Sequence, residues 1–284
     1  KGKIYEVGDK ALVTISYDGD EVKSAVMSDH YRLDKEAVLA VLFVLLLILF
    51  AGKNGVQAIF SFVITVLSIW KILVPCYLKG YSPVWVGIAL TAFLTVVILY
   101  FVYGIEKRTL VASMGSLLGV LTTCVLGIVF TDLFKIHGAV MANSESLLYS
   151  GYENLDLTAI FMSSIFIGAS GAMMDLAVDI TAAVSEVVEK KPEIGWLEAA
   201  KSGMNVGRAA MGTMTTTLLL AYSGGCVALL MVFMAQGTPV NHILNYKYVA
   251  AEVLDTIAGS FGLVTVAPFT ALVAGLILTK KSEN

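Results

Sequence analysis

The chain has 284 residues, of which 57% are hydrophobic and only 14% charged, with a formal net charge of −3. Soluble domains average about 45–50% apolar and about 25% charged residues, so this composition excludes an ordinary soluble domain and indicates a polytopic membrane protein. The small net charge gives no reason to expect nucleic acid or an acidic substrate as a partner.

Residues 1–34 differ from the rest of the chain. Residues 11–17 are rich in β-branched and aromatic side chains, Asp18-Gly19-Asp20 has turn composition, and residues 22–27 form a second run, which predicts a β-hairpin. A single hairpin is only marginally stable in water. We therefore expect residues 1–34 to be an extracytoplasmic β segment, either the truncated end of a larger β-domain or packed on a transmembrane domain, residues 35–284.

Seven hydrophobic segments predict an all-α polytopic membrane domain. A helix needs about 20 residues to cross about 30 Å of hydrocarbon. Polar breaks separate the segments, which are residues 37–52, 56–78, 83–105, 110–134, 157–188, 209–236 and 248–279. The fifth and seventh are longer than one span requires, which predicts tilt, a break or an extension beyond the membrane.

The basic residues of the short loops predict the orientation. With the hairpin outside, nine Lys and Arg lie on the cytoplasmic side and three outside, namely Lys53, Lys107, Arg108, Lys190, Lys191, Lys201, Arg208, Lys280 and Lys281 against Lys79, Lys135 and Lys247. Cytoplasmic loops carry the excess of positive charge. We therefore expect an extracytoplasmic N-terminal segment and a cytoplasmic C-terminus.

The fifth segment places carboxylates inside a hydrophobic run. At about 100° per residue, Asp175, Asp179 and Glu186 fall at about 0°, 40° and 20° and form one stripe. A carboxylate near the bilayer centre costs several kcal/mol unless it meets a partner or water, so the stripe should face protein or a wet cavity. Gly168 and Gly171 precede it and permit either close helix crossing or unwinding near a ligand.

A helix that begins near Trp196 carries the expected counter-charges. Lys201, Asn205 and Arg208 recur on one face, and Pro192 separates this helix from the acidic one. We expect a helical hairpin in which these three side chains are the charge partners of the acidic stripe. Further along lie Thr213 and Thr216, whose hydroxyls can contact a ligand or bond back to a helix carbonyl.

The last segment contributes a third polar face. Glu252 and Asp255 share it with Gly259 and Gly262, so small residues continue the line that the acids begin. Asp255 lies near the outer end of the segment, where we expect water to solvate it. Pro268 follows and predicts a local break with freed carbonyls. We expect the glycines and Pro268 to serve as packing or hinge positions.

Three motifs carry a resemblance to a known family. They are Gly168-Ala-x-Gly-Ala-x-x-Asp175-x-Ala-x-Asp179-Ile, Gly212-Thr-Met-Thr-Thr-Thr-Leu218 followed by Ala221-Tyr222, and the Glu252 helix with Gly259-Ser-x-Gly262 and Pro268. With them the chain resembles the YibE/F-like family of bacterial integral membrane proteins, which commonly have Asn in place of Thr216. The resemblance implies the bacterial cytoplasmic membrane, an upstream anchor and β-domain, and a paired partner, but no reaction.

The leading hypothesis is a transporter or permease of unknown substrate. Asp175, Asp179 and Glu252, with Thr213 and Thr216, would bind a cation or relay protons. The alternative is a non-transporting scaffold or assembly subunit that acts through a membrane or envelope protein. Besides the lipid bilayer, the expected partners are a small ion or solute and a second copy or a related membrane protein.

Enzymatic chemistry is a minor alternative. An intramembrane hydrolase would pair Asp175 with Asp255 or Glu252, which requires close approach of the two carboxyls. No Ser/His/Asp array, phosphate loop or nucleotide fingerprint accompanies these acids. The spacing of the three cysteines and three histidines indicates no disulfide or metal site, and the sequence points to no cofactor.

Overall fold

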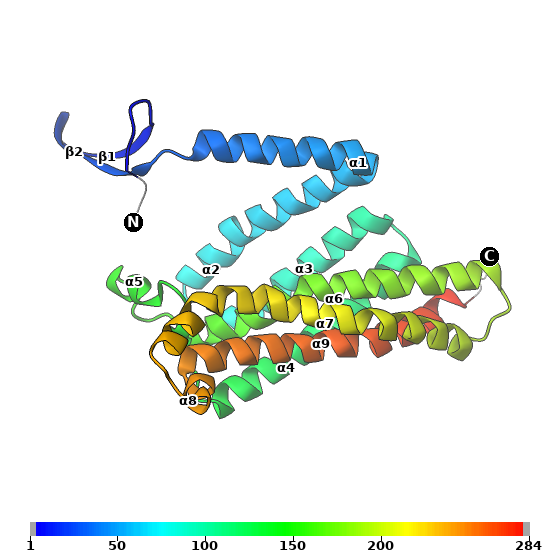
Figure 1. Cartoon of the computed structure of the whole chain (residues 1–284). Helices are drawn as coiled ribbons and strands as arrows, with labels where there is room; N and C mark the ends of the chain where they lie inside the picture. Colours follow the sequence, from blue (N-terminus) through cyan, green and yellow to red (C-terminus); the bar gives the residue numbers. More distant parts are fainter. Residues whose placement is uncertain (1–3, 281–284) are drawn as a thin grey trace. The chain divides into compact units, whose positions relative to one another are not determined.

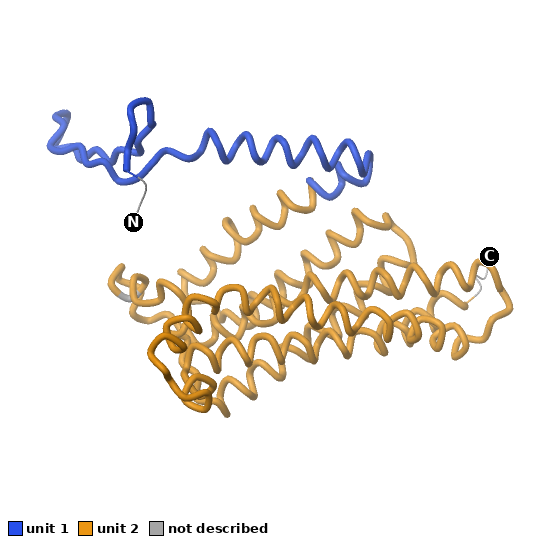
Figure 2. Tube along the Cα trace, in the orientation of Figure 1, with its two compact units in different colours: residues 1–59 blue, residues 60–284 orange. Residues whose placement is uncertain are grey.

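A computed structural model describes residues 4–280, and the chain divides into two compact units, residues 1–59 and 60–284 (Figure 2). The first unit contains the predicted hairpin. Strands β1 (Ala11–Asp18) and β2 (Glu21–His30) pair antiparallel, from Ala11 opposite His30 to Asp18 opposite Glu21. Gly19 makes the turn with φ of 66°. The hairpin is confirmed, while its separation from a membrane domain at residue 34 stays a prediction.

The first two predicted spans are joined directly. Helix α1 (Leu33–Ser68) carries Gly52 in a non-helical conformation, with φ 55° and ψ −126°, so two helices meet there without a loop. A π-helical turn, η1 (Ile69–Leu73), and helix α2 (Val74–Leu78) continue the second of them. Gly52 supplies the kink because a residue without a Cβ adopts such angles readily.

The second unit is a bundle of long helices (Figure 1). Its long members after α2 are α3 (Pro83–Tyr103), α4 (Lys107–Leu133), α6 (Leu157–Lys190), α7 (Trp196–Ala235) and α9 (Lys247–Leu278). Short elements join them, namely η2 (Gly138–Val140), α5 (Ser144–Tyr149) and α8 (Val240–Asn245). Among the described residues, six helical stretches are long and apolar enough to cross a membrane, counting residues 33–78 as one. The all-α polytopic fold is confirmed.

The fifth and seventh predicted segments, which form α6 and α9, were expected to be longer than one membrane span or to be broken. Helices α6 and α9 contain 34 and 32 residues, and both run without interruption. The expected break at Pro268 is therefore wrong, because α9 continues through it to Leu278. The missing N–H removes one helical hydrogen bond, and packing of the surrounding turns keeps the helix together.

Glycines bring α4 and α9 into close contact. A Cβ at Gly115 would overlap Thr270, and one at Gly119 would overlap Val266. From the other side, a Cβ at Gly262 would overlap Thr123. Small residues four apart let two helix backbones approach closely. Gly115 and Gly119 have this spacing. Because α9 packs on α6 and α7 as well as on α4, it lies at the centre of the bundle.

Candidate functional site

The acidic stripe lies on the outward side of α6. Met173 and Ile180 of this helix are fully buried. Asp175 and Asp179 lie away from that core face and are exposed. The Tyr103 hydroxyl of α3 donates a 2.8 Å hydrogen bond to the Val178 carbonyl, which places the end of α3 beside this part of the stripe.

The predicted counter-charges of α7 also face outward. Gly203 and Gly207 form the face of α7 that packs on α6 and α9, where added Cβ atoms would meet Ile180, Val184, Ala267 and Ala271. Lys201, Asn205 and Arg208 lie about 120–180° around the helix from these glycines and are exposed. Among residues 4–280, no ion pair or hydrogen bond joins these three side chains to the acidic stripe. The two helices do form a hairpin, but glycine and aliphatic contacts hold it together.

Other ion pairs gather at the ends of these helices. Glu186 pairs with Lys190 one turn later at 2.5 Å. Glu189 accepts a 2.5 Å hydrogen bond from Arg108 at the start of α4. The last acid of the stripe is thus an exposed helix-end residue and belongs to no buried site.

The predicted hydroxyl ligands bond to their own helix. Thr213 Oγ1 donates to the Ala210 carbonyl at 2.9 Å, and Thr216 Oγ1 donates to the Gly212 carbonyl at 3.0 Å. Both residues are exposed. This is the back-bonding that makes threonine tolerable within a helix. It leaves the hydroxyl oxygens able to accept a further hydrogen bond, so a ligand role stays a prediction.

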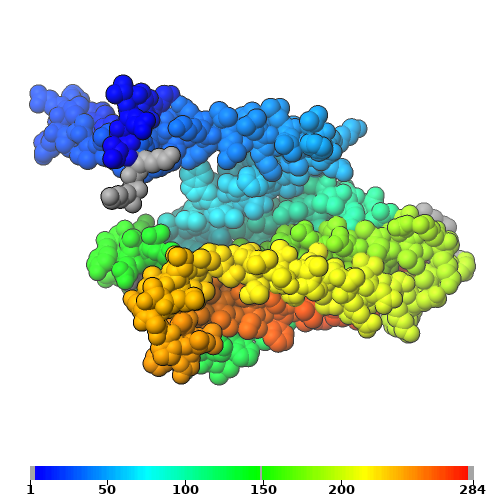
Figure 3. All heavy atoms as spheres, in the orientation of Figure 1, coloured from blue at the N-terminus to red at the C-terminus, as the bar shows by residue number. Residues whose placement is uncertain are grey.

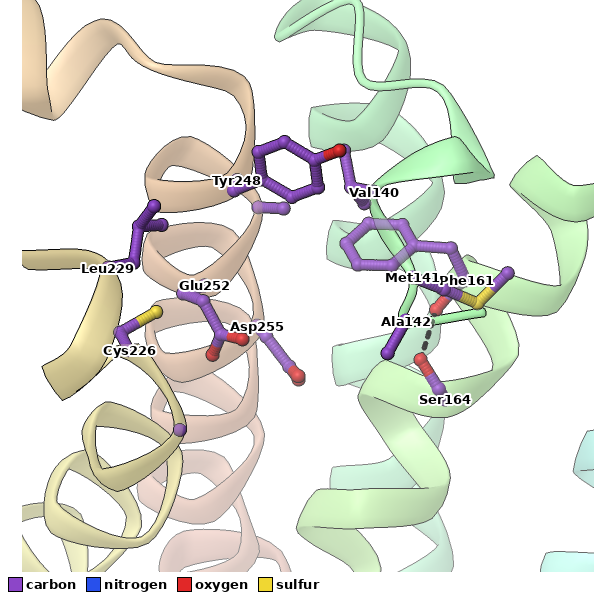
Figure 4. A pocket seen from close by; sticks show the side chains of 12 residues that line it. Val140, Met141, Ala142, Phe161, Ser164, Cys226, Leu229, Tyr248, Glu252 and Asp255 are labelled. Atoms are coloured by element: carbon purple, nitrogen blue, oxygen red, sulfur yellow. Dashed lines mark hydrogen bonds between the residues drawn. The ribbon is translucent and has the colours of Figure 1, made fainter. Parts of the chain in front are cut away.

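Glu252 lies in a cavity of about 400 Å³ that is lined by α6, α7, α9 and residues 140–142 (Figure 4). The polar side chains of its wall are Glu252 and Asp255 from α9, Ser164 from α6 and Cys226 from α7. Apolar and aromatic side chains complete the wall, namely Val140, Met141, Ala142, Phe161, Leu229, Tyr248 and Ala251. No lysine or arginine lines it among the described residues, so the two carboxylates set the charge of this cavity.

Two polar atoms near the cavity are buried without a hydrogen-bond partner among the described residues. They are Asp255 Oδ1 and Tyr222 Oη. In Figure 4 the Asp255 side chain points from α9 toward α6. The Tyr222 hydroxyl lies near both acids, and a group buried in this way usually finds a partner.

Two glycines of the predicted motifs allow the Tyr222 side chain to lie near the cavity. A Cβ at Gly168 would lie 2.7 Å from Tyr222 Oη, and one at Gly259 would lie 3.1 Å from the Ala169 Cβ and 4.0 Å from Tyr222 Cε2. Gly168 and Gly259 thus make room for the tyrosine ring between α6 and α9. Gly171 has nothing within 4 Å of its Cβ position, so no described residue of this chain packs closely there, and its role as a packing or hinge position stays a prediction.

The structure does not bring the acids of α6 into this cavity. Asp175 follows Ser164 by eleven residues, which is about 16 Å along a helix that rises 1.5 Å per residue. The predicted three-helix site therefore divides into a cavity with Glu252 and an exposed stripe with Asp175 and Asp179. This separation also removes the geometric basis for a hydrolase that pairs Asp175 with Asp255 or Glu252.

Sequence reasoning missed part of the cavity wall. Asp255 was expected near the outer end of its helix, where water would solvate it, and Ser164 and Cys226 were not singled out. The available signal was the spacing of Glu252 and Asp255, because residues three apart on a helix present neighbouring side chains to one site. Within residues 4–280, no group of three His, Cys, Asp or Glu side chains is arranged to hold a metal ion together.

Long apolar helices with glycine-mediated crossings and intrahelical carboxylates define a polytopic helical membrane protein. Comparison with protein families identifies it further. Residues 39–280 match the model of the YibE/F-like protein family, and the chain belongs to this family. Comparisons with curated proteins and with solved structures give no match.

Proposed function

We propose that the chain is a membrane permease in which Glu252 and Asp255 bind a small cation or relay protons. The observation that carries this proposal is the cavity between α6, α7 and α9, which collects two carboxylates and no Lys or Arg among the described residues. Carboxylates that share a site repel each other when both are ionised, and a proton or a metal cation relieves that repulsion. Ionisable groups within membrane helices typically mark such pathways.

The surroundings of the acids support the same role. The Tyr222 hydroxyl and the Ser164 hydroxyl are neutral groups that can donate to or accept from a hydrated cation or a protonated carboxyl. Leaving a buried polar atom unpaired costs about 1–3 kcal/mol. A ligand or proton that supplies Asp255 Oδ1 with a partner removes this cost, which favours occupancy of the site.

The orientation of the cavity follows from the charge distribution of the loops. Val140, Met141 and Ala142 of its wall belong to the connection between α4 and α6. With the hairpin outside the membrane, this connection is extracytoplasmic as well. We therefore propose that the cavity opens toward the extracytoplasmic side, where an external ion or solute enters first.

Flux through purified protein in lipid vesicles tests the proposal. Proton flux under an imposed pH gradient, and flux of Na⁺, K⁺ and Mg²⁺, are compared between wild type, Glu252→Gln and Asp255→Asn. If the acids relay protons, each substitution lowers the flux on the order of 10²-fold, as loss of a proton-transfer group does. Asp175→Asn is the matched control and keeps the flux.

Two results contradict the permease proposal. One is an Asp255→Asn variant with wild-type flux, and the other is a folded wild-type protein that conducts none of these cations. The second result favours the scaffold function. That function has its own structural support, because the exposed charged faces of α6 and α7 suit a protein partner better than lipid.

A further inference from the structure

Two exposed helix faces of opposite charge lie on neighbouring helices of the second unit. Asp175 and Asp179 lie on α6, and Lys201 and Arg208 lie on α7. In Figure 3 the surface of α7, in yellow, runs uncovered along one face of this unit. Neither face has an ion-pair partner on the other helix within the described residues.

One residue of each charged face, Asp179 and Arg208, lies at a matching depth. Helix α6 ends at Lys190 and α7 begins at Trp196, so the depth of a residue in either helix can be measured from the short turn between them. Asp179 lies eleven residues before that end, or about 16 Å, and Arg208 lies twelve residues after that start, or about 18 Å. An acid and a guanidinium therefore lie at the same level, more than three helical turns from the connecting turn.

Pairing within one chain is opposed by the packing. Gly203 and Gly207 turn their side of α7 toward α6 and α9, and Ile180 and Val184 fill that contact. Rotating α7 to bring Arg208 onto Asp179 would move the glycines out of the contact and place larger side chains there. The interhelical contact that holds the bundle together thus keeps the two charges apart.

We infer that a second copy of this chain covers these faces in a symmetric dimer, with Asp179 of each copy beside Arg208 of the other. Copies inserted in the same direction share a two-fold axis along the membrane normal, and such an axis joins only residues at equal depth. Asp179 and Arg208 meet this condition to within about 2 Å. Arg208 directly precedes the apolar segment 209–236, so this level lies at the cytoplasmic edge of that segment, where pairing between copies gives each charge an opposite partner.

Mixing charge-reversed variants tests the dimer. In Asp179→Arg the facing positions are both basic, and in Arg208→Asp they are both acidic, so each variant alone should dissociate about tenfold or more readily than wild type. A mixture of the two restores both ion pairs, since each copy then carries the charge that its partner lacks. We expect dimers of one copy of each kind, measured by energy transfer between differently labelled copies in lipid vesicles.

Two controls distinguish an ion pair between copies from one within a single chain. The double variant Asp179→Arg with Arg208→Asp should dimerise with itself, whereas Asp132→Arg, an exposed site on α4, should leave the dimer unchanged. Wild-type protein that stays monomeric in vesicles overturns the inference. So does a mixture that gains no energy transfer although the double variant is restored, because that result means pairing within one chain.

Discussion

Replacing Gly262 with alanine tests how closely α4 and α9 approach. The new Cβ would overlap Thr123 Oγ1 and Met173 Cε, and would lie 2.9 Å from the Gly119 carbonyl oxygen. The methionine can move, but the carbonyl belongs to the α4 backbone, so the two helices must separate. Thr123 Oγ1 also donates a 3.3 Å hydrogen bond to the Ala258 carbonyl, which the displacement would weaken.

The expected loss of stability follows from these contacts. Overpacking costs about 1–3 kcal/mol, and a weakened hydrogen bond adds up to about 1 kcal/mol. Alanine has a higher helix propensity than glycine, which stabilises α9 by about 1 kcal/mol. The net free energy of unfolding should therefore fall by up to about 3 kcal/mol relative to wild type, and by about 1–4 kcal/mol relative to a glycine-to-alanine change without overlap.

Unfolding in mixed detergent micelles, followed by tryptophan fluorescence, measures this difference. Gly171→Ala is the matched control, because its new Cβ has nothing within 4 Å. This control should be unchanged or more stable than wild type by up to about 1 kcal/mol. If Gly262→Ala is as stable as Gly171→Ala, the close crossing of α4 and α9 is refuted.

Three further predictions concern other parts of the chain. Tyr77→Phe removes a buried hydroxyl that donates a 2.9 Å hydrogen bond to Ser163 Oγ, so micelle unfolding should show a loss of about 1 kcal/mol, and unchanged stability would contradict the bond. Two hydrogen bonds of 2.7 and 2.8 Å from Arg32 hold the pKa of Asp29 at about 2, below its usual 3.8. The stabilisation by this ion pair should be complete above about pH 4 and lost as the pH falls through about 2, and a carboxyl ¹³C titration with a midpoint near 4 would contradict it. Gly52→Ala forces a Cβ residue into φ 55° and ψ −126°, which should cost about 1–3 kcal/mol of stability, and a neutral effect in the same unfolding assay would contradict the kink.

Much of the fold could be predicted from local patterns. Runs rich in β-branched and aromatic residues on either side of Asp18-Gly19-Asp20 predicted the hairpin, because turn composition and strand propensity act over a few residues. Long apolar runs predicted the helices, since every backbone polar group in a membrane must be satisfied within its own segment. The helix start near Trp196 was confirmed as well.

The arrangement of the charged faces could not be predicted in the same way. Helical periodicity tells which residues share a face, but it does not tell which face meets a neighbour. In α7 the glycines at 203 and 207 decide this, and they turn Arg208 outward. Small residues mark helix contacts. The spacing of these two glycines therefore contained the signal that Arg208 points outward.

The burial of the Asp255 side chain could not be predicted from local sequence either, because it depends on tertiary structure. Its position near one end of the last segment suggested contact with water. The connection between α4 and α6 instead places Met141 in the wall of the same cavity, and Asp255 becomes half-buried. A segment more than a hundred residues away in the sequence thus determines the surroundings of this acid.

Cation-dependent thermal stability of the purified protein tests the central claim most directly. Na⁺, K⁺, Mg²⁺ and acidification are each titrated against wild type, Asp255→Asn and Glu252→Gln, with Asp175→Asn as control. We predict that at least one of these cations or protons raises the unfolding temperature of wild type and of Asp175→Asn, and that the shift is lost in both cavity variants. A shift that survives in the cavity variants but disappears in Asp175→Asn would place the site on the exposed stripe and contradict the account.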